Sequence, residues 1–78
     1  MTESGIDKEV DAIGLLCPLP VLRARKLLAG MAAGQVLAIT TSDPMAVIDL
    51  PHFCAEAGHI LLDQAEVSGG TRWVIRRG

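Results

Sequence analysis

The fold of this chain is decided by residues 8–31, KEVDAIGLLCPLPVLRARKLLAGM, in which the spacing of apolar residues changes from about two to about 3.6. Charged and apolar residues alternate over Lys8–Ile13, which predicts a β-strand with Val10 and Ala12 on its buried face. From Pro18 to Met31 apolar residues recur at helical spacing, which predicts an α-helix. This stretch therefore reads as a strand that passes through a short connection into a helix.

Outward from this stretch, the chain continues with a second strand and a second helix. Gln35–Thr41 is almost wholly apolar, as expected of a buried central strand. Ser42-Asp43-Pro44 follows as a helix start signal, with Asp43 read as an N-cap. The second helix has the apolar stripe Val47, Leu50, Cys54 and Ala57. Because Pro51 interrupts it, we expect a loose first turn, a regular helix from about Asp49, and an end at Gly58.

Two further strands, Ile60–Val67 and Thr71–Arg77, are separated by the hairpin signal Ser68-Gly69-Gly70. The predicted order is β-α-β-α-β-β, with the first two strands parallel through a right-handed crossover. The fold class is α+β: a two-layer α/β sandwich with a four-stranded mixed sheet and two helices on one face. We expect one domain over residues 8–78 after a flexible N-terminal segment, residues 1–7.

Composition narrows the function. The chain has 78 residues and a formal net charge of −2, which argues against stable nucleic-acid binding through phosphate neutralisation. The apolar runs are too short for a membrane span, and the N-terminus has no secretory signal. We therefore expect a cytoplasmic protein with reduced thiols. The basic residues Arg23, Arg25 and Lys26 form a local cluster that suits a protein partner with an acidic patch.

The chemically informative element is Cys17-Pro18-Leu19-Pro20. Cys17 is predicted to be the N-cap of the first helix, where the helix dipole and an N–H of Leu19 or Val21 favour a thiolate. The expected pKa is lowered to about 7 or below. Such a thiol is a good nucleophile towards sulfane sulfur, and Arg25 and Lys26 would add positive potential if they reached back.

The cysteines, the histidines and Trp73 also have purely structural interpretations. A free cysteine before a helix is often only a small buried hydrophobe. No Cys-x-x-Cys is present, and Cys17, His52, Cys54 and His59 lack zinc-site spacing, so no metal is expected. Cys54 lies on an apolar stripe and is expected to be buried; the alternative is a resolving thiol for Cys17. Both histidines are expected to be solvated, and Trp73 to be half-buried.

The chain resembles the TusA/SirA/YedF family of small sulfur-carrier proteins. The resemblance is carried by residues 11–20 with their Cys-Pro-x-Pro block, by Arg25-Lys26, Ser42-Asp43-Pro44 and residues 49–54, and by the ending at residues 73–78. The chain departs from the tRNA-thiolating members of this family at Leu19, where an acidic residue is common, and at Ala29, where a basic residue occurs.

The resemblance implies a fold like the C-terminal domain of initiation factor three and a persulfide carried on Cys17. No separate cofactor is expected, because the sulfur is held covalently. The implied partners are a cysteine desulfurase and downstream sulfur-relay proteins, which Pro18, Leu19, Pro20, Arg25, Lys26 and Asp43 would help to bind. Relays of this kind end in tRNA thiolation, molybdenum cofactor maturation or sulfur oxidation, and YedF-like members are linked to selenium metabolism.

Three functions follow as hypotheses. The first is a non-classical sulfurtransferase, a carrier that is monomeric when free and has no full substrate pocket. The second is a redox or regulatory protein-binding module that uses Cys17 as a sensor. The third is an RNA-binding module suggested by the fold analogy, although fold alone is weak evidence for function.

Overall fold

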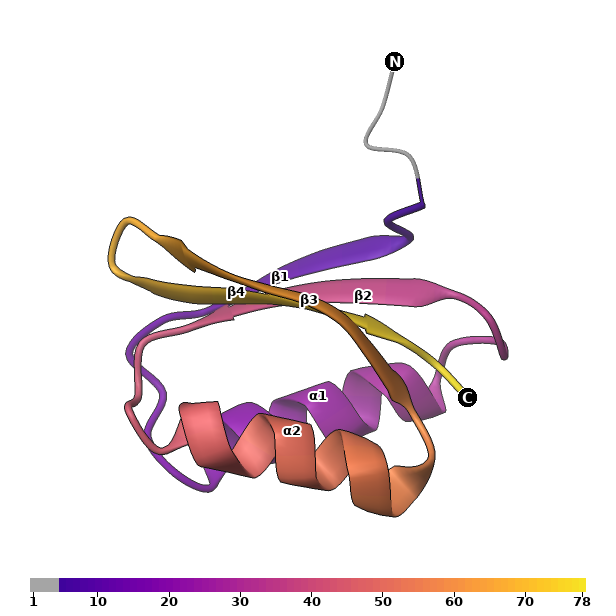
Figure 1. Ribbon diagram of the computed structural model, residues 1–78, viewed down its shortest axis with the longest axis horizontal. Coiled ribbons are helices and arrows are strands. Elements are labelled where there is room, and N and C mark those ends of the chain that lie inside the picture. Colours follow the sequence, from indigo (N-terminus) through magenta and orange to yellow (C-terminus); the bar gives the residue numbers. More distant parts are fainter. Residues whose placement is uncertain (1–4) are drawn as a thin grey trace.

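The computed structural model describes residues 5–78 as two layers, a sheet covered on one face by two helices (Figure 1). The elements are, in order, β1 (Lys8–Ala12), α1 (Leu19–Ala29), β2 (Val36–Thr41), α2 (Ala46–Ala57), β3 (Ile60–Val67) and β4 (Gly70–Arg76). The predicted order and the two-layer sandwich are confirmed. Within the described residues, neither helix has the length and apolar character needed to span a bilayer.

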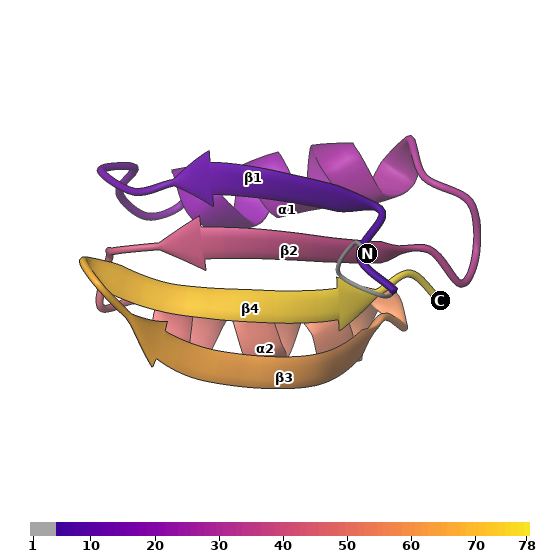
Figure 2. The same ribbon diagram turned by 90° about the horizontal axis from the view of Figure 1, so that it is seen from above.

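The sheet has the strand order β1-β2-β4-β3 (Figure 2). β1 and β2 are parallel, with Val10 opposite Ile39, and β4 is antiparallel to both β2 and β3. Gly70, at the start of β4, comes so close to the end of β2 that a Cβ there would collide with the carbonyl oxygen of Thr41. The hairpin after β3 therefore needs a glycine at this position.

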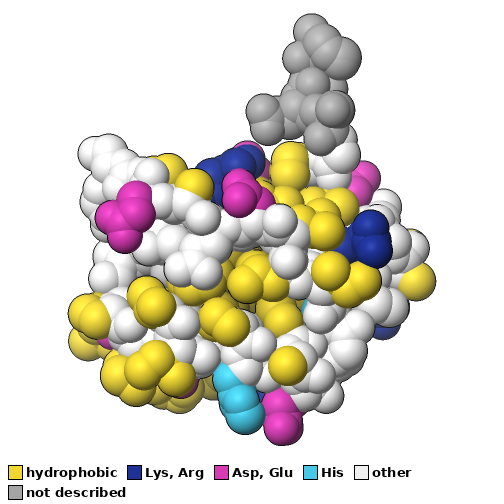
Figure 3. All heavy atoms as spheres, in the orientation of Figure 1, with side chains coloured by type: hydrophobic (Ala, Val, Ile, Leu, Met, Phe, Trp, Pro, Cys, Tyr) yellow, Lys and Arg dark blue, Asp and Glu magenta, His cyan; other side chains and the backbone are white. Residues whose placement is uncertain are grey.

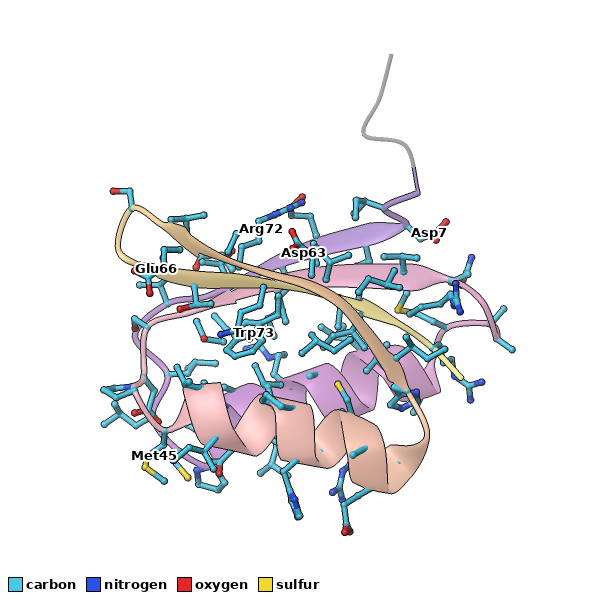
Figure 4. The ribbon with its side chains drawn as sticks, in the orientation of Figure 1. Asp7, Met45, Asp63, Glu66, Arg72 and Trp73 are labelled. Carbon is cyan, nitrogen blue, oxygen red and sulfur yellow. The ribbon has the colours of Figure 1, made fainter. Side chains whose placement is uncertain are left out.

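The core lies between the sheet and the helices. Its largest side chain, Trp73, is fully buried, so the expectation of half-burial was wrong. Trp73 lies between the sheet and the helices (Figure 4), and its indole N–H donates a hydrogen bond of 2.9 Å to Oγ1 of the buried Thr41. Because the buried donor has a partner, the indole can sit in an otherwise apolar layer at little cost. The other core side chains are aliphatic or small, apart from Phe53: Ala12, Ala24, Leu28, Leu37, Ile39, Ala46, Leu50, Cys54 and Ile75.

The opposite face of the sheet carries a smaller apolar cluster, formed by Val36, Ala38 and Val74 with Ile6 packed against it. Beside Ile6, the N–H of Asp7 donates to the carbonyl oxygen of Val36, and the Val36 N–H donates to the Asp7 carboxylate, both at 2.8 Å. The flexible segment predicted over residues 1–7 lies partly outside the described residues. Its last two members, Ile6 and Asp7, contact β2.

Both helices start at residues other than those predicted. α1 starts at Leu19 with Pro18 as its N-cap, one residue later than predicted. α2 starts at Ala46 and continues through Pro51, so its first turn is regular rather than loose. Its buried stripe includes Ala46 and Leu50, whereas Val47 is 49% exposed. α2 ends as predicted at Gly58, whose φ of 79° is a left-handed conformation that favours glycine.

Candidate functional site

The loops that precede the two helices meet at one end of the molecule. Because β1 and β2 are parallel and each is followed by a helix, both helices begin at the same edge of the sheet (Figure 1). Two hydrogen bonds join the loops: Gly14 N–H donates to Ser42 Oγ at 2.8 Å, and Cys17 N–H donates to Asp43 Oδ2 at 2.6 Å. The parallel pair thus brings Cys17 and Asp43 together although 26 positions separate them.

Cys17 is exposed, and it lies before the helix rather than at its cap. The predicted N-cap position is wrong, because Pro18 occupies it and no side chain caps the helix. The N–H of Leu19, predicted to serve the thiolate, donates to the carbonyl oxygen of Leu16 at 2.8 Å. The helix start therefore does not offer the Leu19 donor to the sulfur.

The side chain that meets the sulfur is a carboxylate. The thiol of Cys17 donates a hydrogen bond to Asp49 Oδ2, with an Sγ–Oδ2 distance of 3.2 Å. This bond raises the pKa of Cys17, helped by desolvation and by the negative charges of Asp49 and Asp43. The prediction of a lowered pKa is therefore wrong, because the group in contact with the sulfur is a carboxylate and not a helix N–H.

Asp49 is the site residue that the sequence reasoning did not single out. It lies in the first turn of α2 and is half-buried. The available signal was topological: a polar residue in the first turn of the second helix faces the same sheet edge as a cysteine before the first helix, provided the two strands are parallel. Apolar spacing alone assigned Asp49 only to the start of a regular helix.

Asp43 connects the two loops instead of capping a helix. Its Oδ2 accepts the Cys17 N–H, and its Oδ1 accepts the N–H of Met45 at 3.2 Å. The cap of α2 is Met45, which has no side-chain cap bond, so the N-cap reading of Asp43 was wrong. These contacts place Asp43 directly beside Cys17.

The prolines and the leucine of the Cys-Pro-x-Pro block divide between surface and core. Pro18 and Leu19 are exposed, whereas Pro20 is buried against the core. Pro20 is turned into the interior at the start of α1, whereas Pro18 and Leu19 face solvent next to Cys17.

The basic residues of α1 contact α2 and line the outer surface of the helix. The guanidinium of Arg25 lies over the ring of Phe53, 5.6 Å from its centroid, and so links α1 to α2. Lys26 and Arg23 line a surface hollow of about 260 Å³ together with Leu15, Leu19 and Leu22. Arg25 thus packs on Phe53, and Arg23 and Lys26 form a basic and apolar surface with the leucines along α1.

Exposed apolar side chains gather at the end of the molecule where α2 begins (Figure 3). Met45 lies at the start of α2 (Figure 4), and its backbone shares the Asp43 carboxylate with Cys17. The exposed apolar side chains on the two loops and the first turns of the helices are Ile13, Leu16, Leu19, Leu22, Met45, Val47 and Ile48. Clustered exposed apolar side chains are a feature of protein interaction sites, and here they lie beside the exposed Cys17.

The second cysteine and the histidines lie elsewhere. Cys54 is 2% exposed within the core, and burial raises its pKa, which confirms the structural interpretation over the resolving thiol. His52 is exposed and pairs with Glu56 at 3.8 Å. His59 is half-buried, not solvated: its Nδ1 accepts the Gly78 N–H, and burial lowers its pKa.

Known proteins resemble this chain over most of its length. It is 42% identical over 71 residues to the sulfur carrier protein TusA of Allochromatium vinosum, which covers 91% of this chain and 93% of that protein. It is 48% identical over 67 residues to a protein of Neisseria meningitidis named as a candidate sulfur carrier, which covers 86% of this chain and 90% of that protein.

The fold also matches a solved structure. The crystal structure of a SirA-like protein from Desulfitobacterium hafniense superposes with a TM-score of 0.75 at 28% identity, covering 88% of this chain and 93% of the other. A profile of the family described as sulfurtransferase TusA matches residues 8–77, which include every element of the sheet and both loops around Cys17. The chain therefore belongs to the TusA family of sulfur carriers.

Proposed function

We propose that this protein carries sulfur as a persulfide on Cys17 and relays it from a donor to an acceptor protein. The observation that supports this most is the exposure of Cys17 beside exposed apolar side chains, in contrast to the burial of Cys54 in the core. A persulfide on Cys17 is covalent, so the carrier needs no separate cofactor. The donor by this proposal is a cysteine desulfurase, and the acceptors are downstream relay proteins.

The surface around Cys17 fits a carrier better than an enzyme with its own substrate pocket. The hollow along α1 is lined by Leu19, Leu22 and Lys26 and lies open on the surface. A partner protein with apolar side chains and acidic residues would complement it. We assign docking to this surface, with Pro18, Leu19, Lys26 and Asp43 at its edge, and we place the exchange in the reducing cytoplasm, where an exposed thiol stays free.

The raised pKa of Cys17 changes the expected mechanism but remains compatible with a carrier function. A thiol with a raised pKa is almost wholly protonated at neutral pH. It is therefore a poor redox sensor, because sensor cysteines have a low pKa, are exposed to solvent and often lie next to a resolving cysteine. A carrier that reacts only inside a complex can use such a thiol, provided that something in the complex removes its proton.

The test is sulfur loading followed by intact-mass measurement. The protein is incubated with a cysteine desulfurase and cysteine, and the wild type is compared with Cys17→Ser and, as the matched control, Cys54→Ser. We expect the wild type and Cys54→Ser to gain the mass of one sulfur atom, which dithiothreitol removes, and Cys17→Ser to gain none. Equal loading of Cys17→Ser and wild type would end the proposal.

A further inference from the structure

The carboxylate of Asp49 is the polar group in contact with the sulfur of Cys17. The Sγ–Oδ2 distance is 3.2 Å, which is within hydrogen-bond distance for a thiol that donates to a carboxylate. Asp49 is half-buried in the first turn of α2, whereas Cys17 is exposed. A reactant can therefore approach the sulfur while the thiol remains hydrogen-bonded to the Asp49 carboxylate.

The second carboxylate of the site is occupied differently. Asp43 accepts the backbone N–H of Cys17 with one oxygen and that of Met45 with the other. Both contacts hold the loops in place, and neither reaches the thiol hydrogen. Asp49 alone among the two is placed to accept a proton from Sγ.

We propose that Asp49 is a catalytic residue of sulfur transfer, which takes the proton of Cys17 as the sulfur–sulfur bond forms and returns it to the thiolate that leaves. The proposal rests on the persulfide chemistry proposed above for Cys17 and adds the group that moves the proton. Contact distance satisfies the first requirement of a general base, which is hydrogen-bond reach to the proton that it abstracts.

Loading transfers the outer sulfur of a donor persulfide to Cys17. Sγ of Cys17 attacks the outer sulfur of a donor persulfide, R–S–SH, and forms a new sulfur–sulfur bond. The bond between R–S and the outer sulfur breaks, and its electron pair stays on R–S. The Cys17 proton passes to Asp49 and then to the leaving R–S⁻, which gives R–SH and a Cys17 persulfide with no net oxidation. Unloading is the reverse: an acceptor thiol attacks the outer sulfur, and the departing Cys17 thiolate regains its proton from Asp49.

The raised pKa of Cys17 makes a proton acceptor necessary. Little preformed thiolate exists near neutral pH, so the reaction starts from the neutral thiol. Sulfur becomes more acidic as it bonds to a second sulfur, and the proton then moves to the waiting carboxylate. Because the same proton protonates the leaving group, the donor does not have to release a bare thiolate.

The test compares two reactions of Asp49→Asn, which keeps the shape of the side chain but cannot take up the proton. Iodoacetamide needs only the thiolate, because its iodide leaving group needs no proton. We expect its reaction with Cys17 at pH 8 to be about threefold faster or more in the variant, since the pKa falls and the loss of nucleophilicity offsets only part of the gain. Its pH profile should move to lower pH.

Loading from glutathione persulfide should change in the opposite direction. We expect it to be roughly tenfold slower or more in Asp49→Asn, because general acid–base catalysis is lost. Asp49→Glu should recover part of the loading rate, and Asp63→Asn, an exposed carboxylate on β3, is the matched control that should leave both rates unchanged. A variant that loads as fast as or faster than the wild type overturns the role of Asp49, since a purely electrostatic effect speeds both reactions.

The wild type supplies an independent measurement that does not depend on a variant folding. If the proton moves in the rate-limiting step, loading should be slower in D₂O than in H₂O, compared in the pH range where the rate no longer depends on pH. An absent isotope effect contradicts this proton transfer. Wild type that takes up no sulfur at all contradicts the carrier function itself, so the two failures are distinguishable.

Discussion

The backbone N–H of Cys17 donates a 2.6 Å hydrogen bond to Oδ2 of Asp43, and this bond joins the loop before α1 to the loop before α2. The other Asp43 oxygen accepts the N–H of Met45, at the start of α2. One carboxylate thus sets the position of Cys17 relative to the helix that carries Asp49. The geometry of the thiol therefore depends on the contact between the two loops.

Removing this link should cost stability. We expect Asp43→Ala to lower the free energy of unfolding by about 1.5 kcal/mol, since a hydrogen bond to a charged group is lost at a half-buried side chain. For a domain of this size that corresponds to a fall in Tm of roughly 6–12 °C. Asp43→Asn, which keeps one acceptor oxygen, should lose less. Thermal unfolding checks this, with Asp63→Ala as control; equal Tm values for the two alanine variants would contradict it.

The hydrogen bond between Trp73 and Thr41 offers a test of the core. Thr41→Val replaces the hydroxyl with a methyl group and leaves the buried indole N–H without its acceptor. The expected loss is about 1–3 kcal/mol, the penalty for an unsatisfied buried donor. Urea unfolding should show a larger loss for Thr41→Val than for Thr41→Ser, which keeps the hydroxyl. A valine variant as stable as the wild type would show that the bond is dispensable.

The two thiols should differ in access. Iodoacetamide at pH 8.5 is expected to label Cys17 in the native protein and to leave Cys54 unlabelled until denaturant is added, because Cys54 is 2% exposed. Peptide mapping by mass spectrometry identifies the labelled residue. Labelling of Cys54 at the rate of Cys17 under native conditions would mean that the core opens readily.

Stability should fall at alkaline pH. The folded-state pKa values of Cys17 and Cys54 are both raised, so above about pH 8.5 the unfolded chain releases protons that the folded chain retains. Their contribution is complete below that pH and is lost as the pH rises through the folded-state values. Urea unfolding at pH 7.5 and 9.5 under reducing conditions measures this. Cys54→Ala should show a smaller drop between the two pH values, and an undiminished drop would exclude Cys54 as a cause.

If the surface along α1 docks the donor protein, as proposed, then reversing a charge on it should slow loading from a protein donor but not from a small one. Lys26→Glu should slow loading from a cysteine desulfurase severalfold, because it reverses a charge beside the apolar hollow. Loading from glutathione persulfide should stay unchanged. Arg76→Glu, on the exposed end of β4, makes the same change in net charge and serves as control. Equal effects of the two variants would point to overall charge instead of docking.

Local patterns were sufficient for much of the fold. The change from alternating to helical spacing over residues 8–31 predicted β1 and α1, and the glycine pair at residues 69–70 predicted the hairpin. These features depend on neighbours within one or two turns of chain. The start of α2 did not follow from the local pattern. Pro51 was expected to loosen the first turn, but α2 begins at Ala46 and continues through Pro51.

The sequence by itself determined the order of the elements, the family of the chain, and the position of Cys17 between a strand and a helix. The tertiary structure alone decided what surrounds the sulfur. Cys17 meets Asp43 and Asp49 across separations of 26 and 32 positions, because parallel pairing of β1 and β2 places both helix starts at one edge. A thiol's pKa depends on charges within a few ångströms, and no local pattern records which distant carboxylates those are.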